Sequence, residues 1–124
     1  MTKSDAMINV VQRQLDAYNR HDLETWLQTY AHDAQQYEFP DTLLARGQAE
    51  IRARDTLRFQ EPDLHAQLLR REVNAHQVID HELVTRNFPE GLGTIEMACI
   101  YEIASGKIQK ATFVLGKKII FDQP

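Results

Sequence analysis

The chain has 124 residues, of which 43% are hydrophobic and 26% charged, a balance typical of one globular domain. Fourteen basic and 18 acidic residues give a net charge of -4 without any basic run, which excludes a nucleic-acid surface. No apolar run is long enough to span a membrane, and the only cysteine, Cys99, cannot form an intrachain disulfide. Because the N-terminus also lacks a signal-peptide core, we expect a cytoplasmic protein whose residues 1–124 form a single domain.

The first two segments of the chain predict helices. Apolar residues recur every three or four positions over residues 7–18, which is typical of a helix with one buried stripe. Either Thr2 or Ser4 can cap this helix at its N-terminus. Asp22 is a good N-cap for a second helix, which we expect to end at His32.

One strand and a third helix should follow, before a series of long strands. Residues 34–39 alternate in polarity as a half-buried strand does, and Pro40 stops them. Gly47 opens a heavily charged helix that extends to Leu57 or Phe59. The four long strands are expected at residues 64–74, 77–87, 94–103 and 107–115. This order predicts an α+β fold whose antiparallel sheet carries the helices on one face.

Short phrases at the turns and helix starts carry a resemblance to a known superfamily. They are residues 18–23 (YNRHDL), 30–34 (YAHDA), 46–51 (RGQAEI) and 106–108 (GKI). With the element order, they resemble the nuclear transport factor 2-like superfamily, most closely its SnoaL-like and ketosteroid-isomerase-like branch. The resemblance covers nearly the whole chain. It implies a cone-shaped, strongly curved mixed or antiparallel sheet, which three N-terminal helices close around a pocket.

The resemblance does not carry over the catalytic groups of ketosteroid isomerases. Their oxyanion-hole tyrosine, base aspartate and protonated aspartic acid correspond in this chain to Gln14, Phe39 and Cys99. None of these groups is retained, so steroid isomerisation by that mechanism is not predicted. Asp55 stands where relatives place a tyrosine that supports the oxyanion hole. It is either a buried carboxyl with a raised pKa or an ordinary residue of the helix surface.

Candidate ligand-binding residues share positions on apolar helix stripes or on strand faces that the resemblance turns inward. They are Gln14, Trp26, Tyr30, Tyr37, Phe39, Asp55, His65, Met97, Cys99, Tyr101, Phe113 and Leu115. A buried phenol needs a hydrogen-bond partner, so the tyrosines among them either orient a carbonyl ligand or bond to the backbone.

Three residues are the candidate catalytic groups. Tyr18 lies one helical turn after Gln14, so its hydroxyl can point into the pocket. Asp41 follows the proline closely and can turn back over the pocket mouth. His81 lies on a strand, where an inward imidazole can act as a general base near neutral pH. No metal-ligand spacing or phosphate-binding loop is present, so no metal and no cofactor are expected.

Two functions remain open at this point. The first is an isomerase, cyclase or lyase that abstracts a proton next to a carbonyl of a small, apolar organic molecule without a cofactor. The second is a non-catalytic ligand-binding or dimerisation module of the same fold. An inward carboxylate or histidine close to a phenol would favour the enzyme. A homodimer is expected, because apolar residues are available on the outward sheet face, namely Ala98, Ile100, Val114 and Ile120.

Overall fold

The computed structural model describes residues 2–121. The helices in this part of the chain are α1 (Lys3–Asn19), α2 (Leu23–Gln28), α3 (Gly47–Asp55) and the short 3-10 helix η1 (Arg58–Gln60). The strands are β1 (Tyr30–Glu38), β2 (Thr42–Arg46), β3 (His65–Val73), β4 (Gln77–Phe88), β5 (Gly91–Ala104) and β6 (Lys107–Ile120). The predicted elements are present, and β2 is an additional short strand.

The helix starts follow from their capping residues. Thr2 forms a capping box, in which its hydroxyl accepts a hydrogen bond from the Asp5 amide and the Asp5 carboxylate accepts one from the Thr2 amide. Asp22 caps α2 by accepting from the Thr25 amide. Helix α2 ends earlier than expected, because the chain enters the sheet at Tyr30, which pairs with Ile108 of β6.

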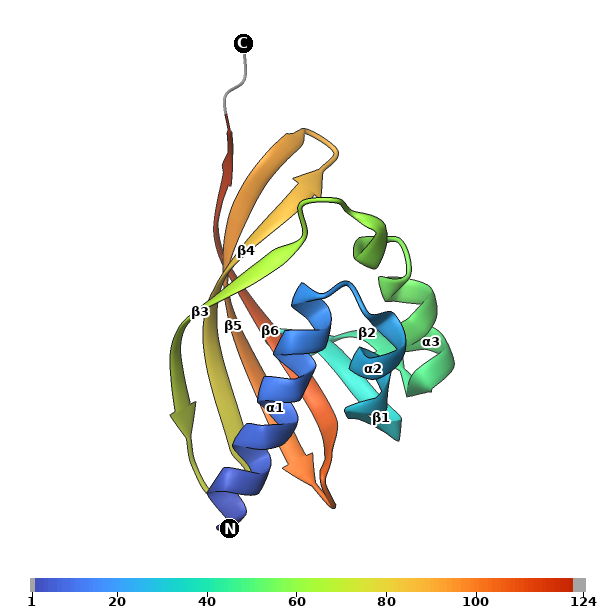
Figure 1. Cartoon of the computed structure of the whole chain (residues 1–124), viewed down its shortest axis with the longest axis vertical. Coiled ribbons are helices and arrows are strands. Elements are labelled where there is room, and N and C mark those ends of the chain that lie inside the picture. Colours follow the sequence, from blue (N-terminus) through green and yellow to red (C-terminus); the bar gives the residue numbers. More distant parts are fainter. Residues whose placement is uncertain (1, 122–124) are drawn as a thin grey trace.

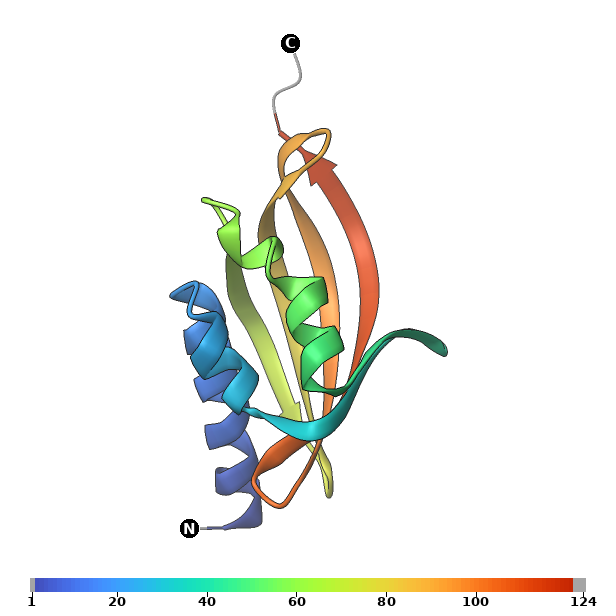
Figure 2. The ribbon, with the colours of Figure 1, turned by 90° about the vertical axis from the view of Figure 1, so that its right-hand side faces the viewer.

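The six strands form one mixed sheet in the order β2-β1-β6-β5-β4-β3. Strand β1 runs parallel to β6, and the other neighbouring strands are antiparallel. The sheet is strongly curved and open, with all three α-helices on the same face (Figures 1 and 2). This arrangement confirms the predicted α+β fold with a curved sheet and N-terminal helices.

The main core lies between the helices and the covered face of the sheet. Val11 of α1, Ile51 of α3 and Val78 of β4 are completely buried there. The uncovered face carries half-buried apolar side chains, including Ile100 and Val114. The homodimer expected from this face stays a prediction. None of the helices within residues 2–121 has the length and apolar character needed to cross a membrane.

Candidate functional site

A cavity of about 180 Å³ lies between the helices and the sheet. Aromatic side chains form much of its wall, and the Trp26 and Tyr30 rings pack with centroids 4.8 Å apart. Tyr18 and Phe113 contribute from α1 and β6. A dry cavity of roughly 150 Å³ holds benzene, so this space suits one substituted ring or a short-chain molecule.

The structure brings ten of the predicted residues together at this cavity. They are Gln14, Tyr18, Trp26, Tyr30, Asp55, Met97, Cys99, Tyr101, Phe113 and Leu115. Five others do not line it, namely Tyr37, Phe39, Asp41, His65 and His81. The predicted placement of these five at the cavity is therefore wrong.

The error on β1 is one of strand face. Gln36 and Glu38 line the cavity, whereas Phe39 is 58% exposed. Because side chains alternate across a strand, Tyr37 lies on the opposite face from both, where Lys110 packs over its ring. Asp41 is exposed in the tight turn between β1 and β2, a hairpin that the sequence did not predict.

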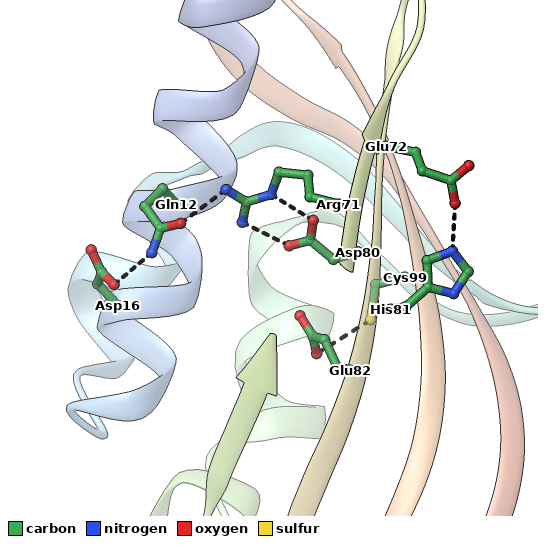
Figure 3. Close-up of polar contacts among 8 residues, drawn as sticks. All are labelled: Gln12, Asp16, Arg71, Glu72, Asp80, His81, Glu82 and Cys99. Atoms are coloured by element: carbon green, nitrogen blue, oxygen red, sulfur yellow. Dashed lines mark hydrogen bonds and ion pairs between the residues drawn. The ribbon is translucent and has the colours of Figure 1, made fainter. Parts of the chain in front are cut away.

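The same inversion occurs on β4. His81 lies on the outer face of the sheet, where its Nε2 is 2.7 Å from Glu72 Oε1 (Figure 3). Its neighbours Asp80 and Glu82 point to the helix side and are buried. His65 is exposed on β3. The candidate base His81 and the candidate ligand-binding residue His65 thus lie outside the cavity, and the carboxyls of Asp80 and Glu82 take the inward positions on β4.

Glu82 is the residue with the most useful chemistry in the cavity wall. Its side chain is buried, and its Oε1 lies 3.6 Å from Cys99 Sγ, which donates a weak hydrogen bond to it (Figure 3). Burial and then repulsion by the Asp80 carboxylate raise the pKa of Glu82 to about 7. A carboxyl with this pKa exchanges protons readily at neutral pH, as a general base or acid must.

A polar network ties this region to helix α1. Arg71 donates two hydrogen bonds to the buried Asp80 carboxylate, at 2.7 and 2.9 Å, and a third to Gln12 Oε1 at 2.9 Å (Figure 3). Gln12 in turn donates to Asp16. The Arg71 charge also opposes the rise in the pKa of Glu82. The Arg71–Asp80 ion pair therefore places one negative and one positive charge near Glu82.

A second inward carboxyl stands on helix α3. Asp55 is buried, and burial raises its pKa, while the neighbouring charges of Arg54 and Arg58 oppose that rise. Arg54 Nη1 lies 3.6 Å from Asp55 Oδ1 and donates a hydrogen bond to Gln36 Oε1 at 3.1 Å. Of the two placements left open by the sequence, the buried one is observed.

Three tyrosines line the cavity, namely Tyr18, Tyr30 and Tyr101, and each buried phenol is a neutral donor. Burial raises the pKa of Tyr18 and the pKa of Tyr30 above the ordinary value for tyrosine, so both hydroxyls stay protonated at physiological pH. Tyr18 interacts electrostatically with both Glu82 and Asp55, and all three residues line the same cavity. Inward carboxyls close to a phenol are the arrangement expected of an enzyme.

Neither the Cys99 thiol nor a metal ion is needed to describe the chemistry of the cavity. Burial raises the pKa of the Cys99 thiol well above its ordinary value, so the thiol is protonated and is a poor nucleophile. Among residues 2–121, no three histidine, cysteine, aspartate or glutamate side chains gather closely enough to hold a metal ion.

Raising the pH should destabilise the protein through Glu82. The folded protein holds the Glu82 proton up to about pH 7, whereas the unfolded chain releases it near the ordinary pKa of 4.5. Between these values unfolding releases a proton, so the free energy of unfolding falls as pH rises. The fall should reach about 3 kcal/mol, at ~1.4 kcal/mol per pKa unit.

Urea unfolding of the wild type and of Glu82→Gln, from about pH 4 to about pH 8, measures this effect. The wild type should lose stability more steeply with pH than the variant, and the loss should level off above the folded pKa. Parallel pH profiles for the two proteins would contradict a raised pKa at Glu82. The raised pKa of Asp55 acts in the same direction in both proteins and cancels in the comparison.

Comparisons with known proteins identify relatives by sequence and by fold. The profile of the SnoaL-like domain matches residues 11–111. No curated protein matches the sequence. A putative SnoaL-like polyketide cyclase from Jannaschia sp. CCS1 is 13% identical, with a TM-score of 0.78 and coverage of 93% of this chain and 89% of that chain.

Two further solved structures share the fold. A Δ5-3-ketosteroid isomerase from Mycobacterium sp. is 17% identical, with a TM-score of 0.74 and coverage of 87% of this chain and 91% of that chain. An epoxide hydrolase of M. tuberculosis, described as LEH-like, is 14% identical, with a TM-score of 0.75 and coverage of 93% and 86%. At these identities the likeness shows a nuclear transport factor 2-like fold that occurs in isomerases, cyclases and epoxide hydrolases.

Proposed function

The chain belongs to the SnoaL-like domain family, and on this premise we propose that it is an enzyme that moves a proton next to the carbonyl group of a small organic molecule. The observation that carries the proposal is the buried carboxyl of Glu82, whose pKa is raised to about 7 on the wall of an aromatic cavity. A base with a pKa near the working pH combines a useful ionised fraction with a useful affinity for protons.

The proposed reaction uses side chains of this chain alone. The Glu82 carboxylate takes a proton from the carbon next to the carbonyl, and the electron pair of the C–H bond moves to the carbonyl oxygen. Hydrogen bonds from the Tyr18 and Tyr30 hydroxyls stabilise the resulting enolate oxygen. In a substrate with a double bond next to the enolate, protonated Glu82 returns the proton to the far carbon, which completes an isomerisation. In a substrate with a second carbonyl, the enolate carbon attacks that carbonyl carbon, and the alkoxide formed takes the proton from Glu82, which completes a cyclisation.

Two observations support this proposal over a purely ligand-binding role. Glu82 and Asp55 are both inward carboxyls, and an apolar binding cavity gains nothing from the cost of burying them. The similar folds include proteins named as an isomerase and a polyketide cyclase, and reactions of both kinds can begin with an enolate.

Deuterium exchange tests the proposal without knowledge of the natural substrate. Acetophenone, phenylacetone and phenylpyruvate are small aryl ketones with acidic C–H groups and suit the cavity in size. Incubated with the protein in D2O, at least one of them should exchange its α-protons faster than in buffer alone, as followed by proton NMR. If ligand-detected NMR shows that these ketones bind and yet none exchanges faster, the protein is a binding module and the proposal is wrong.

A further inference from the structure

Several buried polar atoms of the described chain have no hydrogen-bond partner within it. They are Gln14 Oε1, Trp26 Nε1, Tyr30 Oη, Gln36 Nε2, Asp55 Oδ2 and Arg58 Nε. All six belong to residues that line the same cavity. Buried polar groups are almost always paired in folded proteins, so a concentration of unpaired ones at one cavity indicates a polar ligand.

Most of these unpaired atoms are hydrogen-bond donors. Trp26 Nε1 and Arg58 Nε can only donate. The Gln36 amide can offer only its Nε2 as a donor, because its Oε1 accepts a hydrogen bond from Arg54, and it lies close to Tyr30 and Asp55 in the same wall. The Tyr30 hydroxyl adds a fourth donor, whereas the two remaining atoms, Gln14 Oε1 and Asp55 Oδ2, are an amide oxygen and a carboxyl oxygen. A ligand that satisfies this wall must be rich in acceptor oxygens.

The positive charges of the wall point to the same ligand. Arg86 forms two hydrogen bonds with the Glu61 carboxylate, at 2.8 and 3.1 Å. Arg54 is held by Gln36 and Asp55. Arg58 is the remaining arginine of the wall, and within residues 2–121 its guanidinium makes neither a hydrogen bond nor an ion pair. The Arg58 charge lies near the Asp55 carboxyl, but the donors of its guanidinium are left for a ligand.

Building on the proposed function, we propose that the substrate is a small carbonyl compound that also carries a carboxylate, and that Arg58 binds the carboxylate. A guanidinium offers a planar set of donors that matches a carboxylate. Trp26, Gln36 and Tyr30 then supply donors for the carbonyl oxygen and for the second carboxylate oxygen.

Isothermal titration calorimetry with two isosteric probes tests this inference. Benzoate and benzamide fit the cavity equally well and differ in charge. Because a charge-assisted hydrogen bond contributes more than a neutral one, benzoate should bind about tenfold more tightly or better. Arg58→Met should abolish this preference, because it lowers the affinity for benzoate much more than the affinity for benzamide, and Arg58→Lys should retain part of it.

Arg52→Met is the matched control, because Arg52 lies on the exposed side of α3 and pairs with Glu24 outside the cavity. It should bind both probes as the wild type does. Equal affinity for benzoate and benzamide, or a benzoate preference that persists in Arg58→Met, would overturn the inference.

The calorimetric test is independent of turnover, so the two proposals can fail separately. Exchange of phenylacetone without a benzoate preference would keep the proton-transfer function and reject the carboxylate substrate. A benzoate preference that depends on Arg58, without exchange of any ketone, would keep the carboxylate site and reject the enzyme.

Discussion

Replacement of Glu82 by glutamine is expected to slow deuterium exchange of a responsive aryl ketone by roughly 100- to 10,000-fold, the usual contribution of a positioned general base. The amide has nearly the same size and can still accept the weak hydrogen bond from Cys99, so the cavity should keep its shape. The glutamine amide is not basic at neutral pH, so it cannot accept the proton from the substrate carbon. The same NMR measurement in D2O gives both rates.

The wild-type rate should also depend on pH in a defined direction. Glu82 acts as a base only when ionised, so the rate should rise with pH and level off above about 7, its pKa. A rate that is flat between about pH 5 and about pH 8 would assign the base to another group.

His81→Gln is the informative control, because His81 is one of the catalytic residues predicted from the sequence. The structure places its imidazole on the outer face of the sheet, paired with Glu72. We therefore expect His81→Gln to keep the wild-type exchange rate. Loss of exchange in His81→Gln together with normal exchange in Glu82→Gln would restore the original prediction and reject the present one.

The contrast between these neighbours shows what the sequence can and cannot predict here. Capping residues and turns are local signals, so Thr2, Asp22 and Gly47 marked the helix starts correctly. The parallel pairing of β1 with β6 joins segments far apart in the chain, and no local pattern marks it. Strand β2 was missed for a related reason, since a five-residue edge strand carries little periodicity.

The faces of β1 and β4 were inverted for a different reason, whereas the inward faces of β5 and β6 were predicted correctly. The usual rule buries the apolar residues of an alternating strand and exposes the polar ones. On β1 the cavity wall itself is polar, so Gln36 turns inward and Tyr37 outward. On β4, Val78 and Val84 share the inner face with Asp80 and Glu82, while the outer residues are only half-buried.

A signal for the correct face of β4 was present in the sequence. Both of its alternating sets contain apolar residues, so hydrophobicity alone cannot choose between them. Arg71 on the adjacent β3 supplies the missing information, because a buried acid requires a cation across the strand pair. Asp80 is the residue that pairs with Arg71 in the antiparallel register. Charge matching between neighbouring strands would therefore have favoured the inward placement of Asp80 and Glu82.

Arg71→Met should be the most destabilising of the substitutions considered. It leaves the completely buried Asp80 carboxylate without its partner, and removal of one member of a buried ion pair costs about 3–5 kcal/mol. Typical domains have only about 5–15 kcal/mol of stability in total, so the loss is easily measured by urea unfolding. Arg52→Met breaks an exposed arginine–glutamate pair instead and should leave the unfolding midpoint nearly unchanged.

Asp80→Asn should be milder than Arg71→Met, and this asymmetry separates ion pairing from simple packing. Arg71 keeps its hydrogen bond to Gln12 and is partly exposed, so its charge remains solvated when Asp80 is neutral. Equal losses in the two variants would indicate that shape, and not the stranded charge, sets the cost. Asp80→Asn also removes the anion that repels Glu82, which lowers the pKa of Glu82. The rise of the exchange rate with pH should therefore begin at a lower pH in this variant, which connects the stability of the helix–sheet network to the chemistry of the cavity.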